Sequence, residues 1–252
     1  MRILLTIEYD GTDFSGWQIQ PEKRTVQGVL SDALEQVLGY PVSLHGSGRT
    51  DAGVHAKDQK AHFDLKGEFP YERLPLAINT KLPRDVSVKK AELVPDTFEA
   101  QFSAKRKTYV YDFYVSRVHI PLIDRYSTHV PFPTEKFNEE NARVALEKTI
   151  GTHDFAPFSS TGSKVKDTVR TIYSAKLEKL TENRYRIVVC GNGFLYNMVR
   201  IIAGTVIEVG LSFRSPSCVN DAFVTQKRTC CGPTFAPQGL TLFSVEYENL
   251  GE

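Results

Sequence analysis

The fold is decided first by the stretch Arg2-Ile3-Leu4-Leu5-Thr6-Ile7-Glu8-Tyr9. Apolar side chains at alternate positions fall on one side of an extended chain: Ile3, Leu5, Ile7 and Tyr9. The other side is mostly polar. Because successive side chains of a strand point to opposite faces, this alternation predicts a half-buried strand.

A helix is predicted soon after this strand. Thr25 is suited to be its N-cap, apolar residues recur at helical spacing as far as Leu38, and Gly39 is suited to end it. Further elements are predicted at residues 42–45 (strand), 60–65 (strand), 71–79 (helix, interrupted at Pro75) and 86–94 (strand). The order strand, helix, strand, strand, helix, strand is that of the split βαβ, ferredoxin-like unit.

The second half of the chain repeats this order. Its elements are predicted at residues 109–115 (strand), 138–149 (helix, ended by Gly151), 169–180 and 185–190 (strands), 196–209 (helix) and 240–247 (strand). The sequence therefore predicts an α+β fold of two ferredoxin-like α/β units, residues 1–105 and 106–252. Their antiparallel sheets would flank a cleft, and such open sheet faces suit a large polymer better than a small metabolite.

The composition is that of an ordinary globular protein. The 252 residues carry 31 Lys and Arg against 30 Asp and Glu, a formal net charge of +1. The composition, with 41% hydrophobic and 24% charged residues, excludes collagen, a long coiled coil, wholesale disorder and a disulfide-rich scaffold. The longest apolar run, 201–207, is far shorter than the roughly 20 residues of a membrane span. Four cysteines without metal spacing indicate reduced thiols in a cytoplasmic protein.

The net charge hides a local excess of basic residues. Between Ser160 and Cys190 the chain has seven basic and three acidic residues, and Lys105-Arg106-Lys107 form a basic triplet. A patchy, solvated surface is the commoner outcome of such runs. The alternative is a channel that follows nucleic-acid phosphates, and aromatic residues on the strand at 109–115 favour it because RNA bases stack on aromatic rings.

The most informative loop is Gly46-Ser47-Gly48-Arg49-Thr50-Asp51-Ala52-Gly53-Val54-His55. Its three glycines permit left-handed backbone and close approach of other segments. The loop is neither a Walker nor a dinucleotide-binding loop, because it has no Gly-Lys-Ser/Thr and no G-x-G-x-x-G. Taken alone, Asp51 could be only a turn or cap residue.

The whole loop resembles the catalytic loop of the TruA family of tRNA pseudouridine synthases, whose pattern is close to G-R-T-D-A-G-V-H. Other blocks match the family in the same order: Glu8–Gly11 with Phe14 and Gly16–Gln18, Thr25–Gln27, Asn79 with Leu82-Pro83, Phe98–Ala104, Lys107–Tyr111, His153–Phe155, Phe194–Arg200 and Gly239-Leu240. They span essentially the whole chain. Gln101 stands where the family usually has arginine, at a possible phosphate contact.

The resemblance implies isomerisation of uridine to pseudouridine in the anticodon stem-loop of tRNA, at positions 38, 39 and 40. It implies two RNA-recognition-like α/β halves around a central basic cleft, a homodimer, no cofactor and no catalytic metal. The reaction breaks the N1–C1′ bond, rotates the base and rejoins it through C5. A carboxylate can attack covalently, stabilise cationic character at C1′ or remove a sugar proton, and the sequence leaves these roles open.

Several residues take roles from the resemblance, each beside a plainer alternative. Asp51 matches the catalytic aspartate. Arg200 matches its ion-pair partner, or is a snorkelling surface arginine. Tyr109 stacks on the target base and takes the C5 proton, or is strand core. Arg49 fills the space of the flipped base, or contacts a phosphate only.

The remaining candidates concern binding and packing. Leu240 packs against the site or is a strand-core leucine, His55 is interpreted as structural and Trp17 as core packing. Candidates for phosphate contacts are Lys105, Arg106, Lys107, Lys164, Lys166 and Arg170. A second reading is a non-catalytic RNA-binding protein, and a third is a carboxylate-based nucleoside hydrolase, which lacks a second acidic partner at a recognisable spacing.

Overall fold

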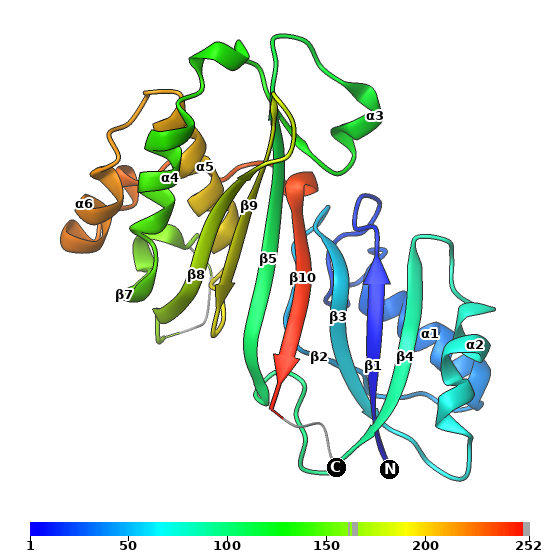
Figure 1. The fold of residues 1–252 in the computed structure, drawn as a ribbon. Helices are drawn as coiled ribbons and strands as arrows, with labels where there is room; N and C mark the ends of the chain where they lie inside the picture. Colours follow the sequence, from blue (N-terminus) through cyan, green and yellow to red (C-terminus); the bar gives the residue numbers. More distant parts are fainter. Residues whose placement is uncertain (161, 163–165, 249–252) are drawn as a thin grey trace. The chain divides into compact units, whose positions relative to one another are not determined.

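The computed structural model describes residues 1–160, 162 and 166–248, and the chain divides into two compact units (Figure 1). The first unit is Met1–Arg106 with the C-terminal segment from Thr241, and the second is Lys107–Leu240. We had assigned residues 106–252 to the second unit. The C-terminal strand β10 (Leu240–Tyr247) instead pairs in parallel with β3 (His55–Asp64), Thr241 lying opposite His55.

The first unit contains the predicted order of strands and helices. In chain order its elements are β1 (Arg2–Tyr9), α1 (Val26–Leu38), β2 (His45–Gly46), β3, η1 (Tyr71–Arg73), α2 (Leu74–Asn79) and β4 (Val86–Val94). The sheet order is β4-β1-β3-β10, and β2 pairs with β3. Every pairing among β1 to β4 is antiparallel. The predicted α+β class is confirmed.

Local chemistry explains most of these boundaries. The Thr25 hydroxyl accepts a hydrogen bond from the Gly28 N–H, and Gly39 ends α1 with a left-handed φ of 79°. Pro75 does not interrupt its helix. It lies in the first turn of α2, where a missing N–H costs nothing.

One predicted strand of this unit is much shorter in the structure. We predicted a strand over residues 42–45, whereas β2 comprises only His45 and Gly46. The Leu44 carbonyl accepts a hydrogen bond from Gln27 Nε2 at 2.8 Å. This carbonyl is therefore used by a helix side chain instead of a sheet ladder.

Both faces of the first sheet are packed. The alternate residues Ile3, Leu5 and Ile7 are fully buried, as predicted. Leu4, on the opposite face, packs in a second cluster with Val94, Phe98 and Ala100. The segment after β4 thus covers the face that the alternation pattern had indicated as polar.

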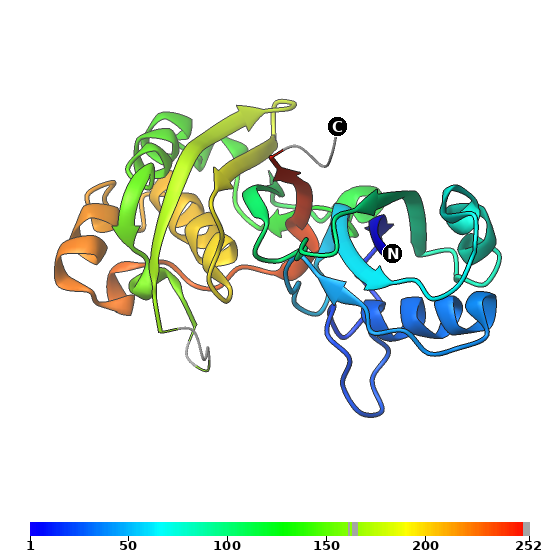
Figure 2. The ribbon, with the colours of Figure 1, turned by 90° about the horizontal axis from the view of Figure 1, so that it is seen from below.

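The second unit is built on β5 (Ala104–Val115), whose residues from Lys107 onward belong to it. Its other strands and α-helices are α3 (Pro121–Asp124), β6 (Thr128–Val130), α4 (Glu139–Glu147), β7 (Gly151–Asp154), β8 (Val169–Lys179), β9 (Arg184–Gly191), α5 (Met198–Gly210) and α6 (Cys218–Thr225). Single 3-10 turns lie at η2 (Thr134–Lys136), η3 (Ala156–Phe158), η4 (Arg228–Cys230) and η5 (Pro237–Gly239). The sheet order is β5-β9-β8-β7, and β6 lies parallel beside β5. Helices α4 and α5 pack against each other (Figure 2).

The sequence pattern missed two strands of this sheet, β6 and β7. We predicted that Gly151 ends a helix over residues 138–149, but α4 ends at Glu147 and Gly151 begins β7 with a φ of 116°. Glycine adopts a positive φ readily, both at the end of a helix and at the start of a strand. A glycine alone therefore does not distinguish these two positions. All four cysteines, each within the described residues, are free thiols, as predicted. No described helix is long and apolar enough to cross a membrane.

Candidate active site

Asp51 lies in the first unit, on the loop that joins β2 to β3. Its side chain is half-buried, whereas Arg49 is exposed. Thr50 between them is buried, and its hydroxyl lies 2.7 Å from the hydroxyl of Tyr9 at the end of β1. Burial raises the pKa of Tyr9 to about 12, so this phenol stays neutral. The loop is therefore tied to the sheet at the residue beside Asp51.

Backbone hydrogen bonds fix the loop on both sides of Asp51. The Trp17 N–H donates to the Thr50 carbonyl at 3.0 Å, and the Gly53 N–H donates to the Phe14 carbonyl at 3.3 Å. The Val54 N–H closes a turn onto the Asp51 carbonyl at 3.1 Å. The backbone of Asp51 thus has little freedom, and its carboxylate projects from a fixed position.

Glycines allow the segment after β1 to lie directly against this loop. A Cβ at Gly11 would overlap the Val54 carbonyl, and a Cβ at Gly16, which has a φ of 91°, would lie 2.7 Å from the Thr50 oxygen. Within the loop, Gly53 has a left-handed φ of 77°, and a Cβ at Gly46 would lie 2.6 Å from the Trp17 ring. Close approach, as much as backbone freedom, requires these glycines.

His55 and Trp17 are structural, as interpreted from the sequence. His55 is 4% exposed, and its Nδ1 accepts the Gly11 N–H at 3.0 Å. Since that lone pair is occupied, Nδ1 carries no proton toward the Asp10 oxygen 3.2 Å away. Trp17 is 2% exposed and packs inside the loop. Neither side chain is available to stack on a base.

Arg200 lies on α5 of the second unit and is anchored by hydrogen bonds. Its Nε donates to the Phe235 carbonyl at 2.7 Å, and its Nη1 donates to Asn197 Oδ1 at 2.7 Å. The side chain is half-buried. A snorkelling arginine would hold its guanidinium in water, so the snorkelling alternative is wrong for Arg200.

Tyr109 and Leu240 are both mostly buried in this unit. Tyr109 is 9% exposed on β5, and its ring meets Phe194 edge to face with centroids 5.1 Å apart. Such a pair orients both rings. Leu240 is 6% exposed at the start of β10.

The predicted phosphate contacts have unlike environments. Lys105 is exposed and pairs with Glu248 at 3.2 Å, and Arg106 and Lys166 are exposed. Lys107 is half-buried, and burial first and then the positive charge of Arg170 lower its pKa to about 8. Lys164 lies outside the described residues.

Comparison with known proteins identifies the chain's relatives. A family model described as tRNA pseudouridine synthase matches residues 5–103 and 145–248. The chain belongs to this family. The synthase is 43% identical over 245 residues to "tRNA pseudouridine synthase A" of Caldicellulosiruptor saccharolyticus, covering 97% of this chain and 99% of that one.

Two further relatives give the same result. The synthase is 44% identical over 250 residues to the Exiguobacterium sp. protein of the same name, covering 99% of each chain. It is 42% identical over 248 residues to that of Lactococcus lactis subsp. lactis, covering 98% of this chain and 97% of that one. The resemblance to the TruA family is thereby confirmed. Asp51, Arg200 and Leu240 lie inside the matched segments, and Tyr109 lies between them.

The predicted site residues of the synthase are distributed over both units. Arg49, Asp51, Lys105 and Arg106 belong to the first unit, and Lys107, Tyr109, Lys166, Arg170, Arg200 and Leu240 belong to the second. The sequence reasoning assigned no role to Asn197 and did not consider Phe235, although both bind the Arg200 guanidinium. Asn197 stands three residues before Arg200 in the motif Phe194–Arg200. Side chains three residues apart on a helix are neighbours, so this spacing could have indicated the contact.

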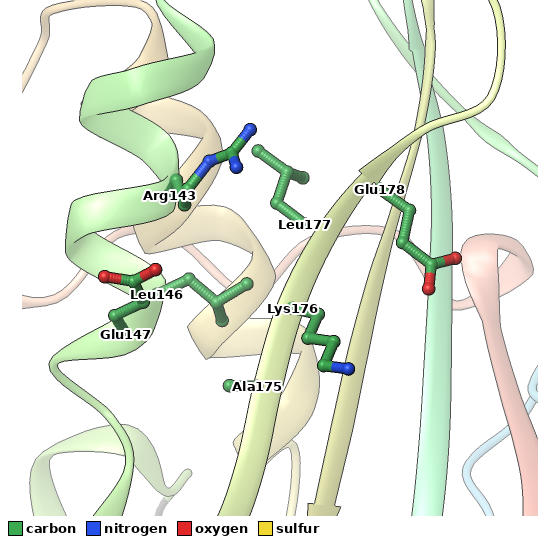
Figure 3. Close-up of a pocket in the computed structure, with 7 residues that line it drawn as sticks. All are labelled: Arg143, Leu146, Glu147, Ala175, Lys176, Leu177 and Glu178. Carbon is green, nitrogen blue, oxygen red and sulfur yellow. The ribbon is translucent and has the colours of Figure 1, made fainter.

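One surface pocket of the synthase lies between α4 and β8, with a volume of about 180 Å³ (Figure 3). Its lining is Arg143, Leu146, Glu147, Ala175, Lys176, Leu177 and Glu178. The described candidate site residues lie elsewhere, and two bases and two acids give this pocket no preference for an anion. In the described part of the chain, no group of three or more His, Cys, Asp and Glu is arranged to hold a metal ion.

Proposed function

We propose that this chain acts on the anticodon stem-loop of tRNA, converting uridine to pseudouridine at positions 38, 39 and 40, with Asp51 as the catalytic carboxylate. Membership of the tRNA pseudouridine synthase family gives the reaction. The half-buried Asp51, on a loop whose backbone is bonded on both sides, is the observation that supports its role. A carboxylate on a fixed backbone stays close to the sugar while the bond from C1′ to N1 breaks and the bond from C1′ to C5 forms, which suits this reaction.

The reaction is balanced without any other reagent. The N1–C1′ bond breaks, the base turns, C5 bonds to C1′, the proton leaves C5, and N1 ends with a proton. Asp51 attacks covalently, stabilises charge at C1′ or removes a sugar proton, all within reach of a carboxylate. In this proposal Arg200 pairs with Asp51 and keeps it ionised.

The other candidates serve binding of the flipped base. We assign Arg49, exposed on the Asp51 loop, to the space that the base leaves in the stem. Tyr109 stacks on the target base and accepts the C5 proton, and Leu240 packs against it. Since these residues belong to different units, catalysis needs both units.

We extend the proposal to the surroundings of the site. Phosphates are bound by Lys105, Arg106, Lys107, Lys164, Lys166 and Arg170. We also propose that both units are of the ferredoxin-like, RNA-recognition-like type. The antiparallel β4-β1-β3-β2 arrangement supports this type for the first unit. The basic cleft, the homodimer and the cytoplasmic location stay predictions from the family resemblance and the cysteines. Sedimentation at micromolar concentration tests the dimer.

Tritium release from tRNA labelled at C5 of uridine tests the catalytic role. We expect Asp51→Asn and Asp51→Ala to lower release at least about a thousandfold, the usual cost of a catalytic carboxylate, while tRNA binding is kept. Asp96→Asn removes the same charge from an exposed loop of the same unit and is the matched control. Full activity in either Asp51 variant would contradict the role. No release by the wild-type protein, with tRNA bound, would favour the non-catalytic RNA-binding alternative.

A further inference from the structure

A chain of hydrogen bonds joins Arg200 to Asn197 and Asn197 to Ser160. Asn197 directly precedes α5, at the N-cap position, and its Oδ1 accepts the Arg200 Nη1–H at 2.7 Å. Its Nδ2 donates to the Ser160 hydroxyl at 2.9 Å. Ser160 is itself held, because its N–H donates to the Tyr196 carbonyl at 3.1 Å. The amide of Asn197 is thus bonded at both ends.

The direction of the amide follows from hydrogen-bond chemistry. A guanidinium only donates, so the group that faces Arg200 must be the amide oxygen. The NH₂ then faces the Ser160 hydroxyl, which has lone pairs to accept it. This leaves one orientation of the Asn197 side chain that satisfies both neighbours.

Asn197 is not used in the way that N-cap asparagines usually are. An N-cap side chain normally accepts a bond from the second or third helical N–H. Among the described residues Asn197 makes no such bond, and its backbone is left-handed, with a φ of 61°. The side chain therefore contributes to Arg200 and Ser160 rather than to the helix.

A second partner of the guanidinium, the Phe235 carbonyl, belongs to the segment at 232–235. A Cβ at Gly204 would overlap the Pro233 carbonyl, so α5 admits this segment only at a glycine. The Gly232 N–H donates to Thr205 Oγ1 at 2.8 Å, and the Phe235 N–H donates to the Arg200 carbonyl at 3.3 Å. The Phe235 carbonyl then lies 2.7 Å from Arg200 Nε.

We propose that Asn197 is a positioning residue, which together with the Phe235 carbonyl sets the plane of the Arg200 guanidinium for the reaction. The inference rests on the proposed role of Arg200 toward Asp51. A guanidinium is a rigid planar fork, so two bonds to different nitrogens fix its orientation. Loss of one bond lets the plane rotate, which costs turnover rather than tRNA affinity.

Two variants of Asn197 separate the amide from the backbone. Asn197→Gly removes the amide and keeps the left-handed backbone without strain. Asn197→Asp keeps an oxygen for Arg200 and loses the donor to Ser160. Gln226→Gly is the matched control, because Gln226 is an exposed residue of the same unit with a φ of 55° at the end of α6.

Single-turnover tritium release and melting temperature are measured for each variant. We expect Asn197→Gly to lower the rate 10- to 100-fold, about the effect of removing a supporting contact, with the apparent tRNA affinity unchanged. We expect Asn197→Asp to stay within about fivefold of wild type, since a charged acceptor still bonds Arg200. Gln226→Gly should react at the wild-type rate. In an Arg200→Ala background, Asn197→Gly should cost nothing further.

Other results would overturn the inference. A rate for Asn197→Gly equal to that of Gln226→Gly would show that the amide is not needed. An equal further loss in the Arg200→Ala background would show that Asn197 acts structurally and not through Arg200. Full activity of Arg200→Ala itself would remove the proposed role of Arg200, and the inference with it. Failure of the inference alone leaves the Asp51 and Arg200 variants inactive.

Discussion

The Asp51 loop and the Arg200 anchor are positioned by different means. In the first unit, backbone hydrogen bonds and close glycine contacts hold the loop, so the position of the carboxylate depends on the main chain. In the second unit, the guanidinium is held by a side-chain amide and one carbonyl. A carboxylate on a fixed backbone tolerates little change around it, whereas an arginine anchored through separate nitrogens can lose the bond to one partner and keep the bond to another.

This difference predicts where a single methyl group does most damage. We expect Gly11→Ala to lower kcat at least about a hundredfold, because the new Cβ overlaps the Val54 carbonyl and must displace the loop. The same overlap should reduce the free energy of unfolding by about 3 kcal/mol. Tritium release and urea unfolding measure the two effects.

Gly39→Ala is the control for this variant. Gly39 also belongs to the first unit and has a φ of 79°, but nothing lies within 4 Å of its missing Cβ. It should lose about 1 kcal/mol from backbone strain and keep its kcat. If Gly11→Ala kept full kcat, the claim that the position of the Asp51 carboxylate depends on a fixed main chain would be wrong.

The Arg200 anchor should be more tolerant of the same change. Gly204→Ala brings a Cβ into the Pro233 carbonyl and pushes away the segment that supplies the Phe235 oxygen. We expect kcat to fall about tenfold, since the Asn197 bond remains, and stability to fall by about 2 kcal/mol. A loss of kcat as large as that of Gly11→Ala would erase the difference between the two regions.

The same contrast explains what the sequence predicted. The Asp51 loop is a contiguous motif whose glycines and buried threonine follow one another, so its special backbone is visible as a pattern. The supports of Arg200 come from residues 160, 197 and 235, and only folding brings them together. Local spacing predicted Arg200 as a candidate but not what holds it.

The fold shows the same limit. Short-range signals gave α1, β1 and β4, because caps and alternation act over a few residues. The pairing of β10 with β3 joins residues 186 positions apart, such as Thr241 and His55, and no local pattern encodes such a partner. The C-terminal strand was therefore predicted as a strand and assigned to the other unit.

A smaller effect should distinguish the two units by their response to pH. Lys107 in the second unit has its pKa lowered to about 8, by burial first and then by the charge of Arg170. It is charged below pH 8 and becomes neutral above it, so any phosphate that it binds is released as the pH rises. We expect tRNA affinity to fall about threefold between pH 7 and pH 9, the contribution of one phosphate contact.

Filter binding at constant ionic strength, with the wild-type protein and Lys107→Arg, measures this effect. The arginine stays charged, so its variant should bind tRNA equally well across the range. Arg170→Gln removes one of the two causes and should move the transition of Lys107 to higher pH, while Asp96→Asn in the first unit should leave it in place.

The stability change has a definite sign. The folded state releases the Lys107 proton near pH 8, whereas the unfolded state retains it to about pH 10.5. The unfolded state therefore binds more protons between these two pH values, and the free energy of unfolding should rise with pH there. Lys107→Met should lose this rise. If tRNA binding did not change with pH in the wild type or in Lys107→Arg, Lys107 would bind no phosphate, and the two units would not differ in their response to pH.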